Sequence, residues 1–226
     1  MEPAGERSMA PHRPGQFVFL TACPAGQRES HPFSLTSRSG SATLSVLIRP
    51  SGDWTELAQD GLAVGYEVAL DGPFGSFTPT VGAGAPASQV WVAAGAGITP
   101  FLSVLRTAPA DMAETDLPTR AELVCIARSP EDMPCWQEIT AIAQQLPWLT
   151  VRPWFTSTAG RPSPETVRQA VEELPAGSAW YLCGPDRLSA MFTAAVRTAT
   201  RAPVYREAYR WRRGAAVTEH QPAGVR

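Results

Sequence analysis

Short apolar runs separated by turn residues fill the first third of the chain. Between residue 16 and about residue 77 these runs read GQFVFL, HPFSLTS, ATLSVLIR and YEVAL, with Gly, Pro and Ser between them. Runs of this length and composition are typical of β-strands joined by tight turns. They predict a small antiparallel sheet or barrel.

In the rest of the chain, apolar runs alternate with helical patterns. The runs lie at residues 90–94, 123–127, 149–155 and 179–183. Such alternation predicts βα units around a parallel sheet. One helix is marked by a capping Ser163, by Pro164 at the first helical position and by an apolar stripe further on, and a second helix is expected after Pro185.

These two patterns of apolar runs divide the chain into two domains. Residues 78–88, TPTVGAGAPAS, contain few side chains that could pack in a core and many Gly and Pro residues that favour bends, so the domain boundary is expected there. We expect an all-β domain over residues 1–79 and an α/β domain over residues 88–213. The composition of residues 214–226 predicts a disordered tail.

Charge and hydropathy exclude several classes of function. A formal net charge of −2 with 18% charged residues gives no basic field for a nucleic-acid backbone. The longest nearly apolar run, VWVAAGAGITPFL, is too short and too rich in glycine to cross a bilayer, and the Pro-rich N-terminus has no apolar signal core. We therefore expect a cytoplasmic chain with no membrane span and no nucleic-acid partner.

The cysteine pattern excludes the common metal centres. The four cysteines, Cys23, Cys125, Cys135 and Cys183, lack the paired spacing of a zinc site or an iron–sulfur cluster. Each stands beside an apolar run, where a buried thiol fits. We expect reduced thiols and no metal site.

A glycine turn is the first candidate for ligand chemistry. In VWVAAGAGITPF, a strand runs into Gly95 and Gly97, and Thr99 and Pro100 stand in the order of an N-cap and a first helical position. Backbone amides at a helix N-terminus suit a pyrophosphate. A plain strand-to-helix turn is the alternative.

The next crossover bears on the choice of nucleotide. AELVCIARSPED ends its strand with Arg128 and Ser129, where an Asp or Glu would accept hydrogen bonds from a ribose 2′-hydroxyl. An arginine fork and a hydroxyl favour a 2′-phosphate, and hence NADP. Arg161 is a candidate second cation, and a solvated pair of loop residues is the alternative.

The last long apolar run ends in Cys183, Gly184 and Pro185. This is the edge at which open α/β sheets bind ligands. A small thiol followed by glycine leaves room for a flat ring. An inert buried cysteine is the alternative.

Two segments of the first half combine ring-stacking and phosphate-binding residue types. HPFSLTS offers Phe33 for stacking, and Ser34 or Thr36 for hydrogen bonds to ring heteroatoms. IRPSGDWT offers Arg49 and the amides and hydroxyl of residues 52–55 for phosphates. Ordinary strands with polar residues facing outward are the alternative.

Taken together and in order, these segments resemble the ferredoxin–NADP reductase superfamily, and within it the dehydrogenase domains of ferric reductases and NADPH oxidases. Six segments have the order and spacing of that family: HPFSLTS at 31–37, IRPSGDWT at 48–55, DGPFG at 71–75, GAGITP at 95–100, CGP at 183–185 and REAYRW at 206–211. The resemblance implies an FAD-binding antiparallel β-barrel followed by an NADP-binding α/β domain. It also implies FAD and NADPH as cofactors.

For the flavin, the resemblance implies that Phe33 stacks near the isoalloxazine and that Ser34 hydrogen-bonds its N5 edge. His31 stands where many reductases carry an arginine, and Arg49 with the GDWT turn would hold the FAD pyrophosphate. The FAD-binding set implied in this way is His31, Pro32, Phe33, Ser34, Leu35, Thr36, Ile48, Arg49, Gly52, Trp54 and Thr55.

For the nucleotide, the resemblance implies that the NADPH pyrophosphate is held by Gly95, Gly97, Thr99 and Pro100. Cys183 would abut the nicotinamide, and Glu207 would belong to the proton and electron transfer region beside the flavin. Ser34, Cys183 and Glu207 are thus the candidate catalytic residues. Tyr209 or Trp211 would cover the flavin ring.

The activity implied is that of an FAD-dependent NADPH oxidoreductase, with ferric iron or a ferric siderophore, haem or an iron–sulfur partner as acceptor. The family's barrel has a complete strand ahead of the PGQF segment, whereas residues 1–13 have no β pattern. The alternative is therefore a truncated, non-catalytic nucleotide-binding module that does not hold flavin stably. Any haem-bearing membrane subunit would be a separate chain, with this one at the cytoplasmic face of the membrane.

Overall fold

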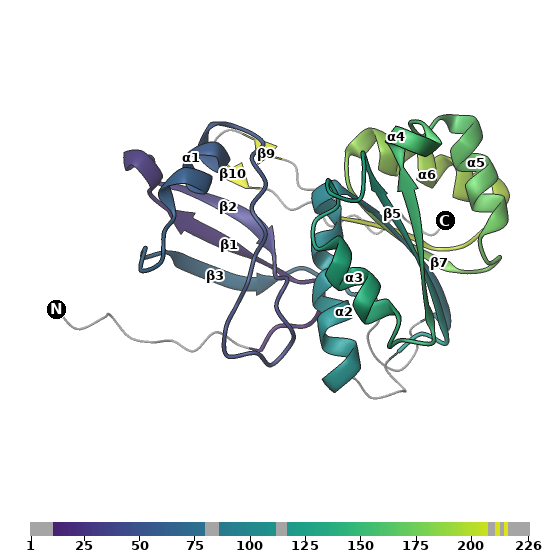
Figure 1. The fold of residues 1–226 in the computed structure, drawn as a ribbon, viewed down its shortest axis with the longest axis horizontal. Coiled ribbons are helices and arrows are strands. Elements are labelled where there is room, and N and C mark those ends of the chain that lie inside the picture. Colours follow the sequence, from purple (N-terminus) through teal and green to yellow (C-terminus); the bar gives the residue numbers. More distant parts are fainter. Residues whose placement is uncertain (1–10, 80–85, 112–116, 208–210, 213–214, 217–226) are drawn as a thin grey trace.

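The computed structural model describes residues 11–79, 86–111, 117–207, 211–212 and 215–216, which form two sheets of different kinds (Figure 1). The first is antiparallel, with the strand order β2-β1-β3. Its strands are β1 (Phe17–Ala22), β2 (Glu29–Ser34) and β3 (Ala69–Phe74). A short 3₁₀ turn, η1 (Pro24–Gly26), follows β1, and helix α1 (Asp53–Gly61) precedes β3.

The second sheet is parallel and has the strand order β6-β5-β4-β7-β8. Its strands are β4 (Ser88–Ala94), β5 (Arg120–Ala127), β6 (Leu149–Phe155), β7 (Ala179–Cys183) and β8 (Val204–Glu207). The predicted succession of an antiparallel domain and a parallel α/β domain is confirmed.

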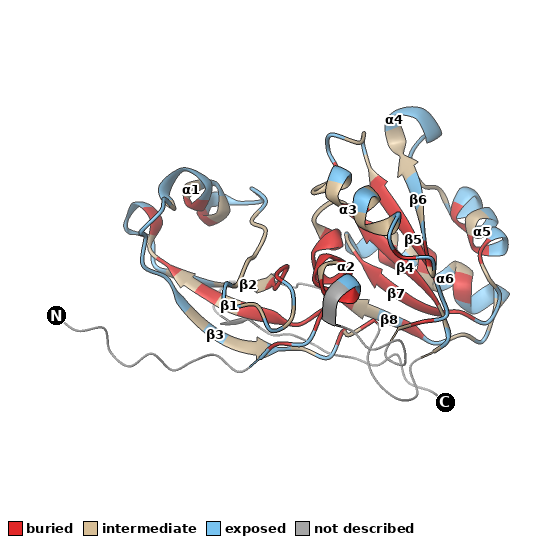
Figure 2. Cartoon of the chain, turned by 60° about the horizontal axis from the view of Figure 1, so that its bottom comes forward, coloured by how far each residue is buried: buried red, intermediate tan, exposed pale blue. Residues whose placement is uncertain are grey.

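Helices cover both faces of the parallel sheet (Figures 1 and 2). One face is covered by α2 (Thr99–Asp111), which follows the 3₁₀ turn η2 (Gly95–Ile98), and by α3 (Trp136–Ala143). The other is covered by α5 (Pro164–Glu173) and α6 (Asp186–Ala199), while α4 (Thr156–Ala159) follows β6. The predicted helix starts at Ser163 and after Pro185 are correct, and the Ser163 hydroxyl accepts the N–H of Thr166.

Alternation along β4 shows why its sequence is almost continuously apolar. Trp91 and Ala93 pack toward α2 and α3, whereas Val90 and Val92 pack toward α5 and α6. Successive side chains of a strand point to opposite faces, so a sheet covered on both faces needs apolar residues at nearly every position. Figure 2 shows that buried residues concentrate in β4, β5 and β7.

The strand order creates a switch point in the parallel sheet. The chain proceeds from β4 outward through β5 to β6, and then returns to place β7 on the other side of β4. The carboxyl ends of β4 and β7 therefore lie side by side, with Ala93 opposite Cys183. Such a switch point is where open α/β sheets bind ligands.

Two expectations for the first half are wrong in detail. ATLSVLIR forms no regular strand, only a bridge between Val46 and Leu35, and residues 47 to 50 approach the cleft described below instead. The GDWT turn is the start of α1, because Trp54 and Ala58 bury at helical spacing and Asp53 suits the positive end of the helix dipole.

Several predictions concern residues outside the described ranges. They are the linker at 80–85, most of the segment 1–13 and Tyr209. Of the predicted tail, the structure describes Ala215–Ala216, strand β10, which pairs with Trp211–Arg212, strand β9. Among the described residues, no helix is long and apolar enough to span a membrane.

Candidate active site

A cleft of about 1410 Å³ lies between the two sheets. Its walls are β2, Leu47, residues 49 to 52 and the start of α1 on one side, and the turns after β4 and β7 on the other. A site for one small ligand usually occupies roughly 300 to 1000 Å³. The cleft is therefore large enough for parts of two ligands.

Most of the predicted site residues meet in this cleft although they come from distant parts of the sequence. Those that line it are His31, Pro32, Phe33, Ser34, Arg49, Gly52, Trp54, Thr55, Gly97, Thr99, Cys183, Gly184 and Pro185. The wall also contains residues that the motifs did not single out, among them Glu29, Ser30 and Asp186.

The other predicted residues lie behind the walls or away from them. Leu35 and Thr36 are buried, and Thr36 is held by a hydrogen bond of 2.9 Å between its Oγ1 and the Oγ of Ser45. Arg128 is exposed at the end of β5, and the Ser129 hydroxyl donates to Asp132. The wall of the cleft also leaves out Ile48, Gly95, Pro100 and Glu207.

Aromatic rings gather on the flavin-motif side of the cleft. The imidazole of His31 stacks on the indole of Trp54 with ring centroids 4.2 Å apart, and Phe33 lies 6.3 Å from the same indole. His31 Nε2 is 2.8 Å from an oxygen of Glu29, and Trp54 donates to the carbonyl of Gln27. His31 and Phe33 share one face of β2, so this wall offers flat, rigid surface to a ring.

The two predicted phosphate-binding segments meet across the cleft. Gly95 has φ of +54°, a left-handed conformation that favours glycine. A Cβ added there would lie 2.8 Å from Nη1 of Arg49, so the guanidinium lies directly over the turn. The sequence predicted both elements, but not that one arginine reaches the other domain's glycine turn.

The turns after β4 and β7 interlock. A Cβ on Gly97 would come within 2.5 Å of the Cys183 carbonyl carbon, and one on Gly184 within 2.8 Å of the Ala94 Cβ. Gly97 therefore serves close backbone packing as well as any ligand. The prediction that Thr99 is an N-cap is wrong, because its φ and ψ are helical and its hydroxyl donates to the Ala96 carbonyl.

Cys183 and Glu207 face each other across β7 and β8, where they are partners in register. Burial raises the pKa of the Cys183 thiol far above its usual range, so the thiol stays neutral. Burial also raises the pKa of Glu207 to about 7. Its Oε2 has no hydrogen-bond partner among the described residues, so this carboxyl can hold or release a proton near neutral pH.

One contact behind the cleft had no signal in any motif. Arg106, in the middle of α2, donates to the main-chain carbonyl of Thr36 in the other domain. A single arginine in an otherwise uncharged stretch of helix was the available hint. Nothing in the sequence indicated its partner.

Two protein families match the two halves of the chain. Residues 5–78 match the family described as FAD-binding domain. Residues 91–194 match the family described as oxidoreductase NAD-binding domain. The first match spans the antiparallel sheet, and the second spans the parallel sheet except for β8 and the start of β4.

Two curated relatives show the same division. The reductase component of propane 2-monooxygenase from Rhodococcus jostii is 32% identical over 207 residues, which cover 82% of this chain and 50% of the relative. NADPH oxidase 3 from Rattus norvegicus is 39% identical over 104 residues, which cover 42% of this chain and 18% of the relative. The chain thus spans half or less of the length of these relatives.

Solved structures share the fold. A ferredoxin NADP+ reductase from Neisseria gonorrhoeae with bound FAD and NADP superposes with a TM-score of 0.67 at 19% identity, over 86% of this chain and 82% of that one. A flavohemoglobin from Malassezia yamatoensis with bound FAD and heme gives a TM-score of 0.70 at 23% identity, over 91% of this chain and 54% of that one.

Proposed function

We propose a specific electron path for this chain, which belongs to the ferredoxin–NADP reductase superfamily and is an NAD(P)H-dependent flavin oxidoreductase. In this path, FAD bound to the first domain takes a hydride from NADPH bound to the second, and releases the electrons singly to an acceptor outside the chain. The observation that carries the proposal is the single cleft in which the HPFS segment and both glycine turns meet.

The residues of the cleft fit these two cofactors. The cleft exceeds the volume of a site for one small ligand, and an aromatic wall faces glycine turns at a helix N-terminus. The Oε2 of Glu207 is buried without a partner among the described residues, as expected of a group that exchanges a proton.

Binding and orientation are the tasks we assign to the first domain. Arg49, with the amides at the start of α1, would hold the FAD pyrophosphate through charge-assisted hydrogen bonds. Phe33 would flank the ring, and the nearly buried Ser34 would hydrogen-bond its N5 edge. Pro32 and Trp54 stiffen this wall.

The second domain would place the nicotinamide against the flavin and exclude water. Cys183 supplies a small, neutral surface at the end of β7, and the glycine beside it leaves room for a flat ring. Glu207, one strand further on, would hold the proton that accompanies electron transfer.

We further propose NADPH in preference to NADH. The side chain of Arg128 is exposed beyond β5 and makes no hydrogen bond or ion pair with another described residue, so its guanidinium is available for a 2′-phosphate. Ser129 and the exposed Arg161 would add to the same site. The support is the absence of an acidic residue at the end of this strand.

The acceptor is proposed only as a class. A relative of the chain is the reductase component of an oxygenase, and another is an NADPH oxidase. We propose an external one-electron acceptor, namely ferric iron or a ferric siderophore, haem or an iron–sulfur protein. A separate haem-bearing membrane subunit would place the chain at the cytoplasmic face of a membrane.

A visible absorption spectrum tests the proposal. The purified chain is mixed with FAD, freed of unbound flavin, and titrated anaerobically with NADPH and, separately, with NADH. We expect a bound flavin spectrum that bleaches faster with NADPH. Failure to retain flavin, with NADP still bound in calorimetry, would overturn the proposal and support a non-catalytic nucleotide-binding module.

A further inference from the structure

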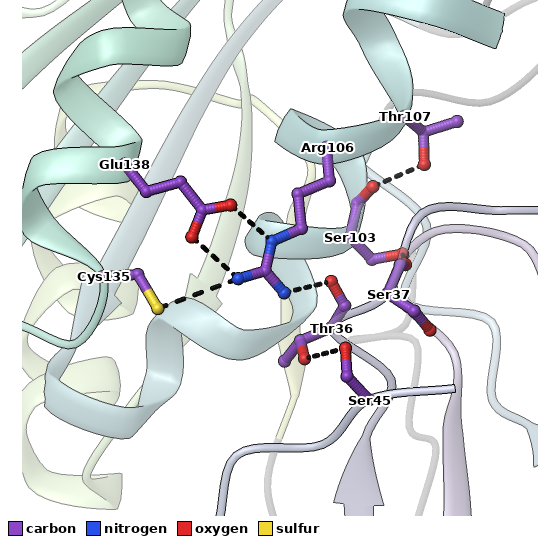
Figure 3. Close-up of polar contacts among 8 residues, drawn as sticks. All are labelled: Thr36, Ser37, Ser45, Ser103, Arg106, Thr107, Cys135 and Glu138. Carbon is purple, nitrogen blue, oxygen red and sulfur yellow. Dashed lines mark hydrogen bonds and ion pairs between the residues drawn. The ribbon is translucent and has the colours of Figure 1, made fainter. Parts of the chain in front are cut away.

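Helix α2 touches both of the proposed cofactor sites. It begins at the glycine turn, where Thr99 lines the cleft. Further along, Ser103, Arg106 and Thr107 have i, i+3 and i+4 spacing and lie on one face. All three contact the segment 36–39, which follows the flavin-motif strand β2. Figure 3 shows the contact of Arg106 with Thr36.

Arg106 uses all three of its guanidinium nitrogens in this contact. Its Nε and Nη2 each donate over 2.7 Å to the two carboxylate oxygens of Glu138 on α3, and its Nη1 donates over 2.7 Å to the carbonyl of Thr36 (Figure 3). The two-pronged pairing with Glu138 fixes the plane of the guanidinium. The third nitrogen is thereby aimed across the domain boundary.

Thr36 passes this restraint on to the flavin motif. Its N–H donates over 2.8 Å to the carbonyl of Ser45, its hydroxyl bonds to the same residue's side chain, and it is 3% exposed. It stands two residues after Ser34, which lines the cleft. Only Leu35 separates the two residues, and because Leu35 is fully buried in close packing it has little freedom to absorb a shift of Thr36 before the shift reaches Ser34.

Neutral hydrogen bonds support the same contact. The Ser103 hydroxyl donates over 2.7 Å to the carbonyl of Ser37, and the N–H of Ser39 donates over 3.0 Å to Oγ1 of Thr107. Charge-assisted hydrogen bonds are roughly twice as strong as neutral ones. Arg106 therefore contributes the strongest of these links between α2 and the segment 36–39.

We infer that Arg106 is a positioning residue for electron transfer, which holds the Thr36 carbonyl and, through it, Ser34 in fixed register with the nucleotide-binding turn at the start of α2. The inference rests on the proposed function, since the register is that between flavin and nicotinamide. Glu138 aims the guanidinium and is its orienting partner. Lysine could reach one partner but could not form the fork.

The first test needs no turnover. Hydrogen exchange is followed in the peptide covering residues 33–40 of the full chain, for the wild type, Arg106→Gln, Arg106→Lys, Glu138→Gln and, as a control, Arg168→Gln, which removes an exposed arginine of α5. We expect exchange at least about tenfold faster in Arg106→Gln, with smaller increases in Arg106→Lys and Glu138→Gln. Unchanged exchange in Arg106→Gln would overturn the inference.

The second test measures how well the flavin and the nicotinamide are positioned against each other, through the rate of flavin reduction. Because a misplacement of about 1 Å can cost on the order of a hundredfold in rate, we expect flavin reduction by NADPH to slow tenfold to a hundredfold in Arg106→Gln. The FAD dissociation constant and KM for NADPH should stay within about threefold, and the charge-transfer absorbance between flavin and nicotinamide should weaken. Arg168→Gln should match the wild type in every readout.

The outcomes distinguish a failure of the proposed function from a failure of the inference about Arg106. If the wild type holds FAD but is not reduced by NADPH, the proposed function fails, whereas the exchange measurement still decides whether Arg106 restrains the segment. If the wild type is reduced and the variants slow only in proportion to lost flavin, Arg106 merely stabilises the fold and the inference fails. Should Arg106→Gln not fold, Arg106→Lys and Glu138→Gln give the same readouts.

Discussion

The interlocked turns after β4 and β7 give the sharpest prediction, which concerns Gly97→Ala. The added methyl would lie 2.5 Å from the Cys183 carbonyl carbon and 2.9 Å from the Gly184 nitrogen, whereas ordinary contact begins at 3.4 Å. Both neighbours are backbone atoms at the end of a central strand. The Cys183 carbonyl oxygen lies closer still, so the two turns must move apart by at least about 1 Å.

The effects of this movement on stability and on flavin reduction can both be estimated. Overpacking of this kind costs about 1 to 3 kcal/mol. In a chain of this length, each kcal/mol lowers Tm by roughly 2 to 4 °C. The nicotinamide site moves with the turn, so we expect flavin reduction to slow by on the order of a hundredfold. Thermal unfolding and anaerobic stopped-flow absorbance measure the two effects.

Gly177→Ala is the matched control. Gly177, unlike Gly97, has a positive φ, of +79°, and an added Cβ would meet nothing within 4 Å. Its cost is therefore backbone strain of about 1 to 2 kcal/mol, without movement of the cleft. If Gly97→Ala slowed flavin reduction no more than Gly177→Ala, the close packing would not be what positions the nicotinamide.

Three further substitutions test the site. Because the folded state raises the pKa of Glu207 to about 7, the free energy of unfolding of the wild type should fall by about 3 kcal/mol as the pH rises from the unfolded pKa of this carboxyl to above 7. Glu207→Gln should remove this dependence of Tm on pH. If Tm fell equally with pH in both proteins, Glu207 would not hold a buried proton. Arg49→Gln should raise the FAD dissociation constant by roughly tenfold to a hundredfold in a fluorescence titration, and unchanged affinity would show that Arg49 does not hold the phosphates. Arg128→Ala should lower kcat/KM for NADPH about tenfold or more and leave that for NADH unchanged; equal losses would count against a 2′-phosphate site.

The elements that the sequence predicted are those whose pattern is local. Apolar runs located four of the five parallel strands, because a sheet covered on both faces needs apolar side chains throughout, whereas the edge strand β8, with an exposed Tyr205, gave no such run. Helix α1 was not predicted, because only Trp54 and Ala58 of its nine residues are buried, which is too few for a recognisable apolar stripe. The predicted N-cap at Thr99 was wrong, because the 3₁₀ turn η2 starts the helical backbone four residues earlier, at Gly95.

The candidate site was predictable as a set of residues, but not as an arrangement. Each motif identified a short segment, and the switch point of the sheet brings two of these segments together. The contact of Arg49 with the Gly95 turn and the hydrogen bond from Arg106 to Thr36 join residues far apart in the chain, the latter pair by 70 positions. No local pattern encodes such pairings, because they depend on how the two domains dock.

The interlock of Gly97 with Cys183 and of Gly184 with Ala94 also bears on the engineering of cofactor preference. A designer who grafts the loop after β4 from a homologue would normally treat it as an independent module. Here the backbone of each loop fills the space that a side chain of the other would need. The two loops must therefore be exchanged as a pair from the same parent, and libraries that vary one alone will be dominated by clashes rather than by changes in specificity.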